Sequence, residues 1–169
     1  KSDSGGVVLN LESSEAVLQA AENMLQRYKT THLHSNIQGF ALQEMIERSG
    51  AHELILGVSE DSVFGPVMLF GKGGKAVEMV KDKSLALPPL TPELATELVM
   101  RTQIYNLLKG YRDEKTANIE AIVQCLVNLS QLVIDLPMVK ELDINPLLAD
   151  NQGVIALDAR IKVNLGTTN

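Results

Sequence analysis

Apolar residues recur along two stretches of the chain at the intervals typical of one face of a helix. The first stretch comprises Val17, Leu18, Ala21, Met24, Leu25 and Tyr28, and the second comprises Ile119, Ile122, Val123, Leu126, Val127, Val133 and Ile134. Residues three and four apart lie on the same side of a helix. The pattern therefore predicts two amphipathic helices, the first capped by Ser13 or Ser14 and the second ended by Pro137. Val123, Leu126 and Val127 are expected to be buried together beneath a sheet.

Shorter apolar runs bounded by turn residues predict strands. These runs are residues 7–11, 40–46, 54–58, 67–70, 76–80, 142–148 and 154–161. A further helical segment is predicted to start with Thr91 as its N-cap and Pro92 at the first helical position. Strands in series with separate helices are typical of an α+β fold, with a mainly antiparallel sheet against which the helices pack.

The last predicted hairpin carries polar side chains on both strands. Because residues alternate between the faces of a strand, Asp143 and Asn145 share one face. A two-residue turn at 151–152 pairs Asn145 with Asp158 across the hairpin. A glycine bulge at Gly153 would shift this pairing by one residue and leave the two side chains near neighbours.

Two interpretations of this polar face remain open from spacing alone. An amide oxygen beside a carboxylate suits Mg²⁺, which takes one or two protein oxygens and completes its octahedron with water and phosphate. The alternative is the solvated face of a half-buried hairpin.

Composition limits the classes of function. The chain has 169 residues, of which 45 % are apolar, so it can bury the core of one domain or a little more. Its net charge is −6 and it has no long basic run, which argues against a nucleic-acid partner. The sequence has no apolar run long enough to span a membrane.

A single cysteine excludes an intrachain disulfide and is compatible with a reducing cytoplasm. With Lys1 first and no signal-peptide pattern, the chain is expected to be a piece of a longer cytoplasmic protein.

Three further features carry competing interpretations. Gly5 and Gly6 either present backbone N–H groups to a phosphate or form an ordinary turn. The glycine-rich residues 71–74 match neither a Walker motif nor a dinucleotide fingerprint, and their lysine either neutralises phosphate or is simply solvated. Cys125 lies on the apolar stripe of the long helix, where a core role is expected.

Several segments, taken in order, resemble one known family. They are KSDSGGV at 1–7, QEMI at 43–46, ELILGV at 53–58, FGP at 64–66, GKGG at 71–74, ELDINPL at 141–147 and ALDAR at 156–160. Together they resemble the ATP-grasp domain of ADP-forming acyl-CoA synthetases. The last two segments, residues 141–147 and 156–160, form the closing motif of the domain, which is shared with the β-subunit of succinyl-CoA synthetase. The resemblance covers almost the whole chain, and its closing motif and FGP block are specific.

The resemblance implies a metal site in the last hairpin. In this family the Asn of the INPL motif and the Asp of the LDA motif hold Mg²⁺ on the nucleotide phosphates, and they match Asn145 and Asp158. Arg160 lies two residues beyond the metal Asp, within reach of a phosphate.

The resemblance also implies a set of nucleotide-binding residues. They are Gly5, Gly6, Glu44, Met45, Ile46, Glu53 and Arg160. The glycines match the loop over the phosphates, and residues 44–46 match the linker strand whose backbone touches adenine. Glu53 matches the acid that holds the ribose hydroxyls. The expected cofactors are Mg²⁺ and ATP or ADP.

A division into domains follows from the same resemblance. Residues 1–36 are expected to be a remnant of the N-terminal ATP-grasp lobe, residues 37–165 the C-terminal lobe, and residues 166–169 a tail. The rest of the first lobe, with its phosphate-binding lysine, is expected before Lys1. The expected partners are nucleotide, a CoA thioester and the rest of the same polypeptide. The piece alone is expected to be inactive and to bind ATP weakly.

The resemblance leaves two functions open for the whole protein, beside a third in which the domain binds no ligand. The first is an ADP-forming acyl-CoA synthetase, which converts acid, CoA and ATP to acyl-CoA, ADP and phosphate. The second is a regulatory domain of a bacterial protein lysine acetyltransferase that senses nucleotide or acyl-CoA without synthetase turnover. Residues 84–90, SLALPPL, favour the second because active synthetases usually carry an arginine in this segment.

Overall fold

The computed structural model describes residues 6–31, 37–74, 82–110 and 116–164. Its contacts divide the chain into two compact units, Lys1–Glu47 and Arg48–Asn169. The second unit contains the sheet, and all six of the strands described below belong to it.

Among its described residues, the first unit contains one helix, α1 (Ser14–Thr31), which the apolar periodicity predicted. Ser13 caps it, because its Oγ accepts a hydrogen bond from the Ala16 N–H at 3.1 Å. The strands predicted at residues 7–11 and 40–46 were wrong: the described residues of both are irregular. A strand needs a neighbour for its backbone hydrogen bonds, and the described residues of this unit form no ladder. None of these residues is buried, so they form no core.

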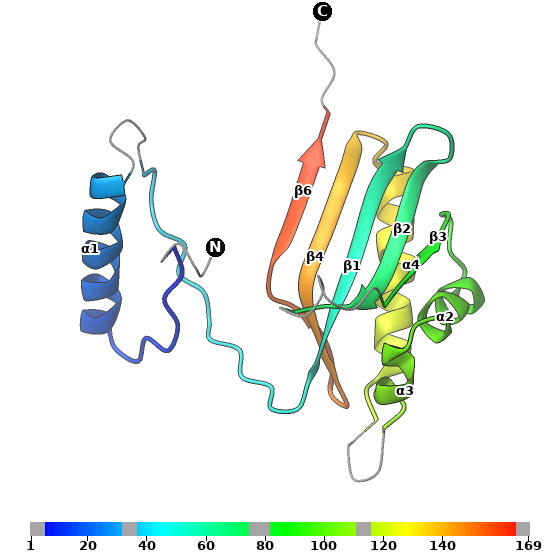
Figure 1. Cartoon of the computed structure of the whole chain (residues 1–169), viewed down its shortest axis with the longest axis horizontal. Helices are drawn as coiled ribbons and strands as arrows, with labels where there is room; N and C mark the ends of the chain where they lie inside the picture. The colour runs from blue at the N-terminus through cyan, green and yellow to red at the C-terminus, as the bar shows by residue number, and fades with distance from the viewer. Residues whose placement is uncertain (1–5, 32–36, 75–81, 111–115, 165–169) are drawn as a thin grey trace, which may run out of the picture. The chain divides into compact units, whose positions relative to one another are not determined.

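The second unit is built on an antiparallel sheet. Its strands are β1 (His52–Asp61), β2 (Gly65–Lys72), β3 (Lys83–Ala86), β4 (Val139–Asp150), β5 (Gly153–Ala156) and β6 (Ala159–Val163). Within the described residues the strand order is β3-β2-β1-β4-β5 (Figure 1). β6 follows β5 end to end, and both pair with the same edge of β4, β5 with residues 147–150 and β6 with residues 139–144. The predicted strand at 76–80 lies outside the described residues. The short strand β3 was not predicted, because a run of only four residues close to two prolines shows little alternation.

Three helices lie on one face of this sheet: α2 (Pro92–Met100), α3 (Ile104–Leu108) and α4 (Ile119–Asp135) (Figure 1). Thr91 caps α2 as predicted, with its Oγ1 accepting from the Leu94 N–H. Asn118 caps α4 by accepting from the Ala121 N–H at 2.9 Å. The two caps satisfy backbone donors that have no partner within the helix.

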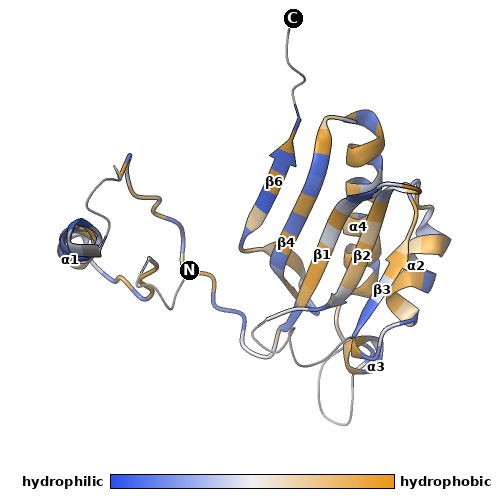
Figure 2. Cartoon of the chain, turned by 45° about the horizontal axis from the view of Figure 1, so that its top comes forward, coloured by the Kyte–Doolittle hydropathy of each residue, from blue (hydrophilic) through white to orange (hydrophobic). Residues whose placement is uncertain are grey.

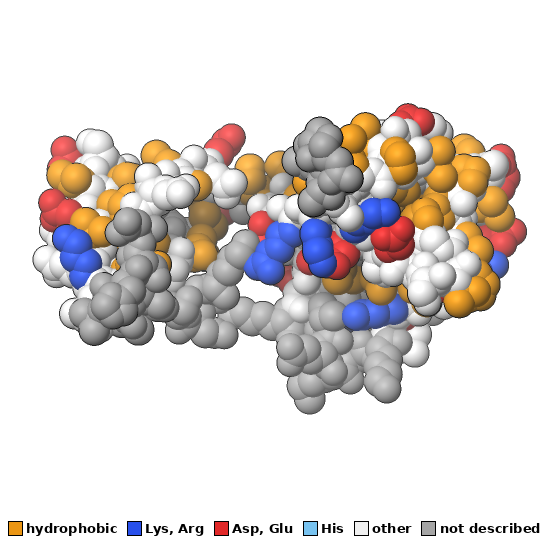
Figure 3. Space-filling model, turned by 90° about the horizontal axis from the view of Figure 1, so that it is seen from above, with side chains coloured by type: hydrophobic (Ala, Val, Ile, Leu, Met, Phe, Trp, Pro, Cys, Tyr) orange, Lys and Arg blue, Asp and Glu red, His pale blue; other side chains and the backbone are white. Residues whose placement is uncertain are grey.

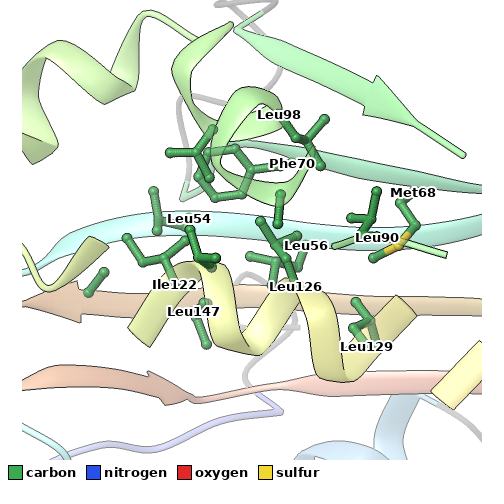
Figure 4. Packing of buried hydrophobic residues seen from close by; sticks show 14 of the residues in the cluster. Leu54, Leu56, Met68, Phe70, Leu90, Leu98, Ile122, Leu126, Leu129 and Leu147 are labelled. Atoms are coloured by element: carbon green, nitrogen blue, oxygen red, sulfur yellow. The ribbon is translucent and has the colours of Figure 1, made fainter. Parts of the chain in front are cut away.

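The core lies between this helix layer and the sheet (Figure 4). Its fully buried large side chains include Leu54, Leu56, Met68, Phe70, Leu98, Ile122, Leu126 and Leu147. Val123 and Leu126 are buried as predicted. Val127 is only partly buried, so that part of the prediction was wrong. Val127 directly follows Leu126, so its side chain points about 100° away around the helix axis and lies at the edge of the contact with the sheet.

The opposite face of the sheet bears polar groups at alternate positions. Hydrophobic and hydrophilic residues alternate along β4 (Figure 2), as a strand with one buried face requires. Leu142 faces the core at 4 % exposure, whereas Glu141 is exposed and Asp143 is half-buried. Glu141 and Asp143 therefore lie on the face that the helices leave uncovered.

Candidate functional site

The last hairpin has the register that its turn predicted. Asp150 pairs with Gly153 across the turn, Leu147 pairs with Ala156, and Ile144 pairs with Ala159. The one-residue shift considered for a glycine bulge is absent from these pairs. The hairpin thus keeps one register from Glu141 to Asp150, on both sides of the Asn145 position, and shifts only between Val139 and Glu141.

Asn145 and Asp158 lie directly opposite each other in this register. The Asn145 N–H donates to the Asp158 carbonyl oxygen at 3.1 Å, and the Leu157 N–H donates to the Pro146 carbonyl oxygen at 3.0 Å. The single return strand predicted over 154–161 was wrong, because it divides into β5 and β6 at residues 157–158. Pro146 has no N–H to donate, so the regular ladder is interrupted there.

The irregularity also extends to the other side of β4. The register between β1 and β4 shifts between Leu54 and Leu56, so β4 has one more residue than β1 in this interval. A bulge of this kind re-aims side chains and is over-represented next to functional sites. Asn145 and Asp158 are both half-buried at this point, which leaves their polar groups partly accessible to solvent.

Charged side chains surround the pair along β4 and β6. Arg160 Nε lies 3.9 Å from Asp158 Oδ2, with side chains 64 % and 41 % exposed, so the attraction is weakened by water. Farther along, Lys162 Nζ donates to Glu141 Oε1 at 2.6 Å, and this hydrogen bond and charge raise the pKa of Lys162. Figure 3 shows basic and acidic side chains beside one another on this unit.

The donor set around Asn145 has the chemistry of a Mg²⁺ site that shares its ion with a ligand. Within the described residues, no three His, Cys, Asp or Glu side chains come together to hold a metal by themselves. Asn145 and Asp158 offer one amide and one carboxylate oxygen from opposed backbone positions. Two protein oxygens suit Mg²⁺ when water and phosphate supply the remaining ligands.

Glu53 lies at another part of the sheet, beside the glycine-rich loop after β2. The Gly73 N–H donates to the Glu53 carbonyl oxygen at 2.8 Å. The Glu53 carboxylate lies so close to Gly74 that a Cβ at that position would collide with it. Gly74 also has a φ of +80°, which a side chain would strain. The fold thus places an exposed carboxylate against a loop twenty residues away in sequence.

The remaining predicted nucleotide-binding residues belong to the first unit. Gly5 lies outside the described residues, and Gly6 is exposed. Glu44 and Met45 are exposed and Ile46 is half-buried, all in an irregular segment. Residues 44–46 belong to no strand in the described structure, so strand pairing does not occupy their backbone N–H and C=O groups. A segment that binds a ligand through its backbone needs such groups.

The sequence pattern predicted no role for Asp82, which is buried and accepts two backbone hydrogen bonds. It is 5 % exposed, and its two carboxylate oxygens accept the N–H groups of Gln103 and Ile104 at 2.6 and 2.7 Å. Its carbonyl oxygen accepts the Lys72 N–H at 3.1 Å. Asp82 therefore ties the end of β2 to the start of α3. An aspartate before a strand gave no local signal of this contact.

Comparison with known proteins identifies the family and the fold of the chain. Residues 1–163 match the family model of an ATP-grasp domain. The chain is 37 % identical over 161 residues to the β-subunit of ADP-forming acetate–CoA ligase I of Pyrococcus furiosus, covering 95 % of this chain and 68 % of that subunit. It is also 37 % identical over 163 residues to the ADP-forming 4-hydroxybutyrate–CoA ligase of Nitrosopumilus maritimus, but spans only 23 % of that protein.

Two solved structures of acetyl-coenzyme A synthetase 1 from Ca. Korarchaeum cryptofilum extend the comparison. One, in complex with coenzyme A and Ca-AMPCP, matches with a TM-score of 0.89 and 34 % identity over 97 % of this chain and 71 % of that chain. Another, with coenzyme A and Mg-AMPPCP, matches with a TM-score of 0.79 and 33 % identity over 97 % and 70 %. In the part of this chain that the structure describes, no helix has the length and apolar character needed to cross a bilayer. The chain belongs to the ATP-grasp domain family, and its relatives include ADP-forming acetate–CoA ligases.

Proposed function

We propose that this chain is the nucleotide-binding part of an ADP-forming acid–CoA ligase. The reaction converts acid, CoA and ATP to acyl-CoA, ADP and phosphate, or runs in reverse. The observation that carries the proposal is the opposition of Asn145 and Asp158 in the last hairpin of an ATP-grasp fold. The similarity to ligase subunits over 95 % of the chain supports it.

Each site residue has a defined task in this proposal. Asn145 and Asp158 hold Mg²⁺, which when bound neutralises charge on the nucleotide phosphates. Arg160 contributes a second positive charge, since its guanidinium lies near the same carboxylate and is mostly exposed. Phosphoryl transfer depends on such positioning and charge neutralisation more than on covalent chemistry by the protein.

The other residues bind the rest of the nucleotide. The Glu53 carboxylate accepts hydrogen bonds from the ribose hydroxyls, and the backbone of residues 44–46 contacts adenine. Gly5 and Gly6 cover the phosphates with their N–H groups. The rest of the polypeptide supplies the coenzyme A site and completes the N-terminal lobe.

Substitution of the two metal ligands in the whole protein tests the proposal. Asp158→Asn removes the anionic ligand and is expected to weaken Mg²⁺–ADP binding more than Asn145→Asp, which keeps two oxygen ligands. The loss of affinity should be at least as large as the roughly 10–100-fold typical of an outer-shell partner of a metal site. Titration calorimetry with Mg²⁺–ADP measures both.

Asp143→Asn is the matched control for that experiment. It removes one carboxylate charge from the same strand of the same hairpin, two residues from Asn145. Nucleotide affinity should change little in this variant. Equal losses in Asp143→Asn and Asp158→Asn would show that only the general charge of the face matters, and the metal assignment would be wrong.

A regulatory function in a protein lysine acetyltransferase is the second candidate, and the absence of an arginine from residues 84–90 keeps it open. Ala86, in the segment where active synthetases usually carry an arginine, pairs with Met68 at the outer strand of the sheet. No guanidinium is available from the described residues 82–90. An assay of ATP formation from acyl-CoA, ADP and phosphate by the whole protein separates the two: a synthetase forms ATP, whereas a sensor binds the nucleotide and forms none.

A further inference from the structure

One ion pair of the second unit joins two residues far apart in sequence. Arg48 Nη1 donates to Asp150 Oδ1 at 3.0 Å across 102 positions. The two side chains are only 23 % and 14 % exposed. By contrast, those of the helical pair Arg101–Glu97 are 60 % and 59 % exposed. Because partial burial reduces screening by water, the Arg48–Asp150 pair is the more strongly coupled of the two.

Asp150 is itself held in a fixed position. Its Oδ1 also accepts the N–H groups of Gln152 and Gly153, at 2.8 and 3.2 Å, which closes the turn between β4 and β5. Its carbonyl oxygen accepts the Asn118 N–H at 2.8 Å. Since Asn118 is the N-cap of α4, the carboxylate that receives Arg48 is attached to both the hairpin and the core helix.

Arg48 occupies a special position in the chain. It is the first residue of the second unit, and its carbonyl oxygen accepts the Ala51 N–H at 3.1 Å in the turn that leads into β1. Ile46 precedes it by two residues, and two residues span at most about 7 Å. Anchoring Arg48 therefore restricts how far Ile46 can move.

We propose that the Arg48–Asp150 ion pair is a positioning device for the nucleotide-binding segment at residues 44–46. This inference rests on the proposed function, in which the backbone of that segment contacts adenine. β4 carries both Asp150 and the metal ligand Asn145, about 17 Å apart along the strand. Because Arg48 follows Ile46 by two residues, the anchor limits the freedom of the end of the adenine-binding segment. It lowers the cost of ordering that segment when nucleotide binds.

Two variants of the whole protein test this inference. Arg48→Met keeps much of the side-chain length without charge, and Asp150→Asn keeps an oxygen that can accept the turn N–H groups. Each is expected to raise the KM for Mg²⁺–ADP about tenfold, with kcat within about twofold. The double variant should raise KM no more than either single variant, because each removes the same interaction. Arg48→Lys, which keeps the charge, should recover part of the affinity.

Lys140→Met and Glu60→Gln are the matched controls. Like the Arg48–Asp150 pair, the Lys140–Glu60 pair uses a residue of β4, here Lys140, whose Nζ lies 2.8 Å from Glu60 Oε1 of β1, but it is distant in sequence from residues 44–46. Its loss should leave KM unchanged. Hydrogen exchange adds a second readout: Mg²⁺–ADP should protect the amides of residues 44–46 less in Arg48→Met than in the wild type.

The outcomes distinguish this inference from the proposed function. If the wild type binds Mg²⁺–ADP and both anchor variants keep its KM and its protection of residues 44–46, the inference is wrong and the proposed function stands. A lower unfolding midpoint with unchanged KM also overturns it, because the pair is then merely structural. If the wild type does not bind the nucleotide, both proposals are wrong. Circular dichroism identifies any variant that does not fold, and Arg48→Lys then provides the decisive comparison.

Discussion

Two aspartates with the same hydrogen-bonding pattern differ in burial, and burial determines how much each contributes to the stability of the fold. Asp82 and Asp61 each accept two backbone N–H groups, but Asp82 is buried whereas Asp61 lies in the exposed β1–β2 turn. The N–H groups of Phe64 and then Val63 lower the pKa of Asp61. A lowered pKa stabilises the folded turn at neutral pH, and that contribution is lost as the pH falls through the lowered value.

Replacing Asp82 by alanine is expected to destabilise the second unit strongly. At the start of α3 the buried Ile104 N–H loses its acceptor, at a cost of about 1–3 kcal/mol. The part-buried Gln103 N–H also loses its acceptor, at a smaller cost because water reaches it. Urea unfolding followed by circular dichroism measures this loss. Asp61→Ala is the control, because water replaces the carboxylate in an exposed turn. Equal effects of the two substitutions would contradict the role assigned to burial.

At the scale of elements, α4 and the last hairpin depend on each other. The helix places one apolar stripe against β1 and β4, and the Asn118 N–H at its start bonds to the Asp150 carbonyl oxygen in the hairpin. The stripe supplies burial, whereas the hydrogen bond fixes the position of the helix along the strand. The geometry of the Asn145–Asp158 pair therefore relies on helix packing from the opposite face of the sheet.

Leu126 and its neighbour Val127 test which part of α4 is core. Leu126 is fully buried, so Leu126→Ala should lower the free energy of unfolding by about 2–5 kcal/mol through lost burial and a cavity. Val127→Ala should cost clearly less, because that side chain is only partly buried. Denaturant unfolding of both variants provides the comparison. A loss below about half a kcal/mol for Leu126→Ala would be incompatible with the packing in Figure 4.

At the scale of the whole molecule, the two units differ in how much they bury. The second unit has a layered core, whereas every described residue of the first is at least partly exposed. Apolar side chains such as Val8, Leu9 and Leu42 remain 44–71 % exposed there. Burial of apolar area is the main force that holds a segment rigid. The first unit thus lacks a rigid frame for residues 44–46.

Weak nucleotide binding by residues 1–169 alone is the expected consequence. Ordering the first unit around a nucleotide costs conformational entropy that the few contacts within it do not offset. Calorimetry should show much lower Mg²⁺–ATP affinity for this chain than for the whole protein. Micromolar affinity of the chain by itself would show that the first unit is already organised for binding.

Local patterns in the sequence were sufficient where neighbours in the chain determine structure. The apolar spacing predicted α1 and α4, the Thr91-Pro92 pair predicted the start of α2, and the turn at 151–152 predicted the register that opposes Asn145 and Asp158. In each case the relevant contacts lie a few residues apart or follow from the two-residue period of a strand. The metal role of Asn145 and Asp158 remains a prediction.

Tertiary structure alone decided the features that depend on distant partners. The segments at 7–11 and 40–46 are apolar enough for strands, but a strand forms only where another supplies hydrogen bonds. The return strand breaks at residues 157–158 because Pro146 lies across from it. Arg48 and Asp150 meet across 102 positions, which no local pattern encodes. Periodicity specifies which face of an element is buried, whereas the identity of its neighbours emerges only when the whole chain packs.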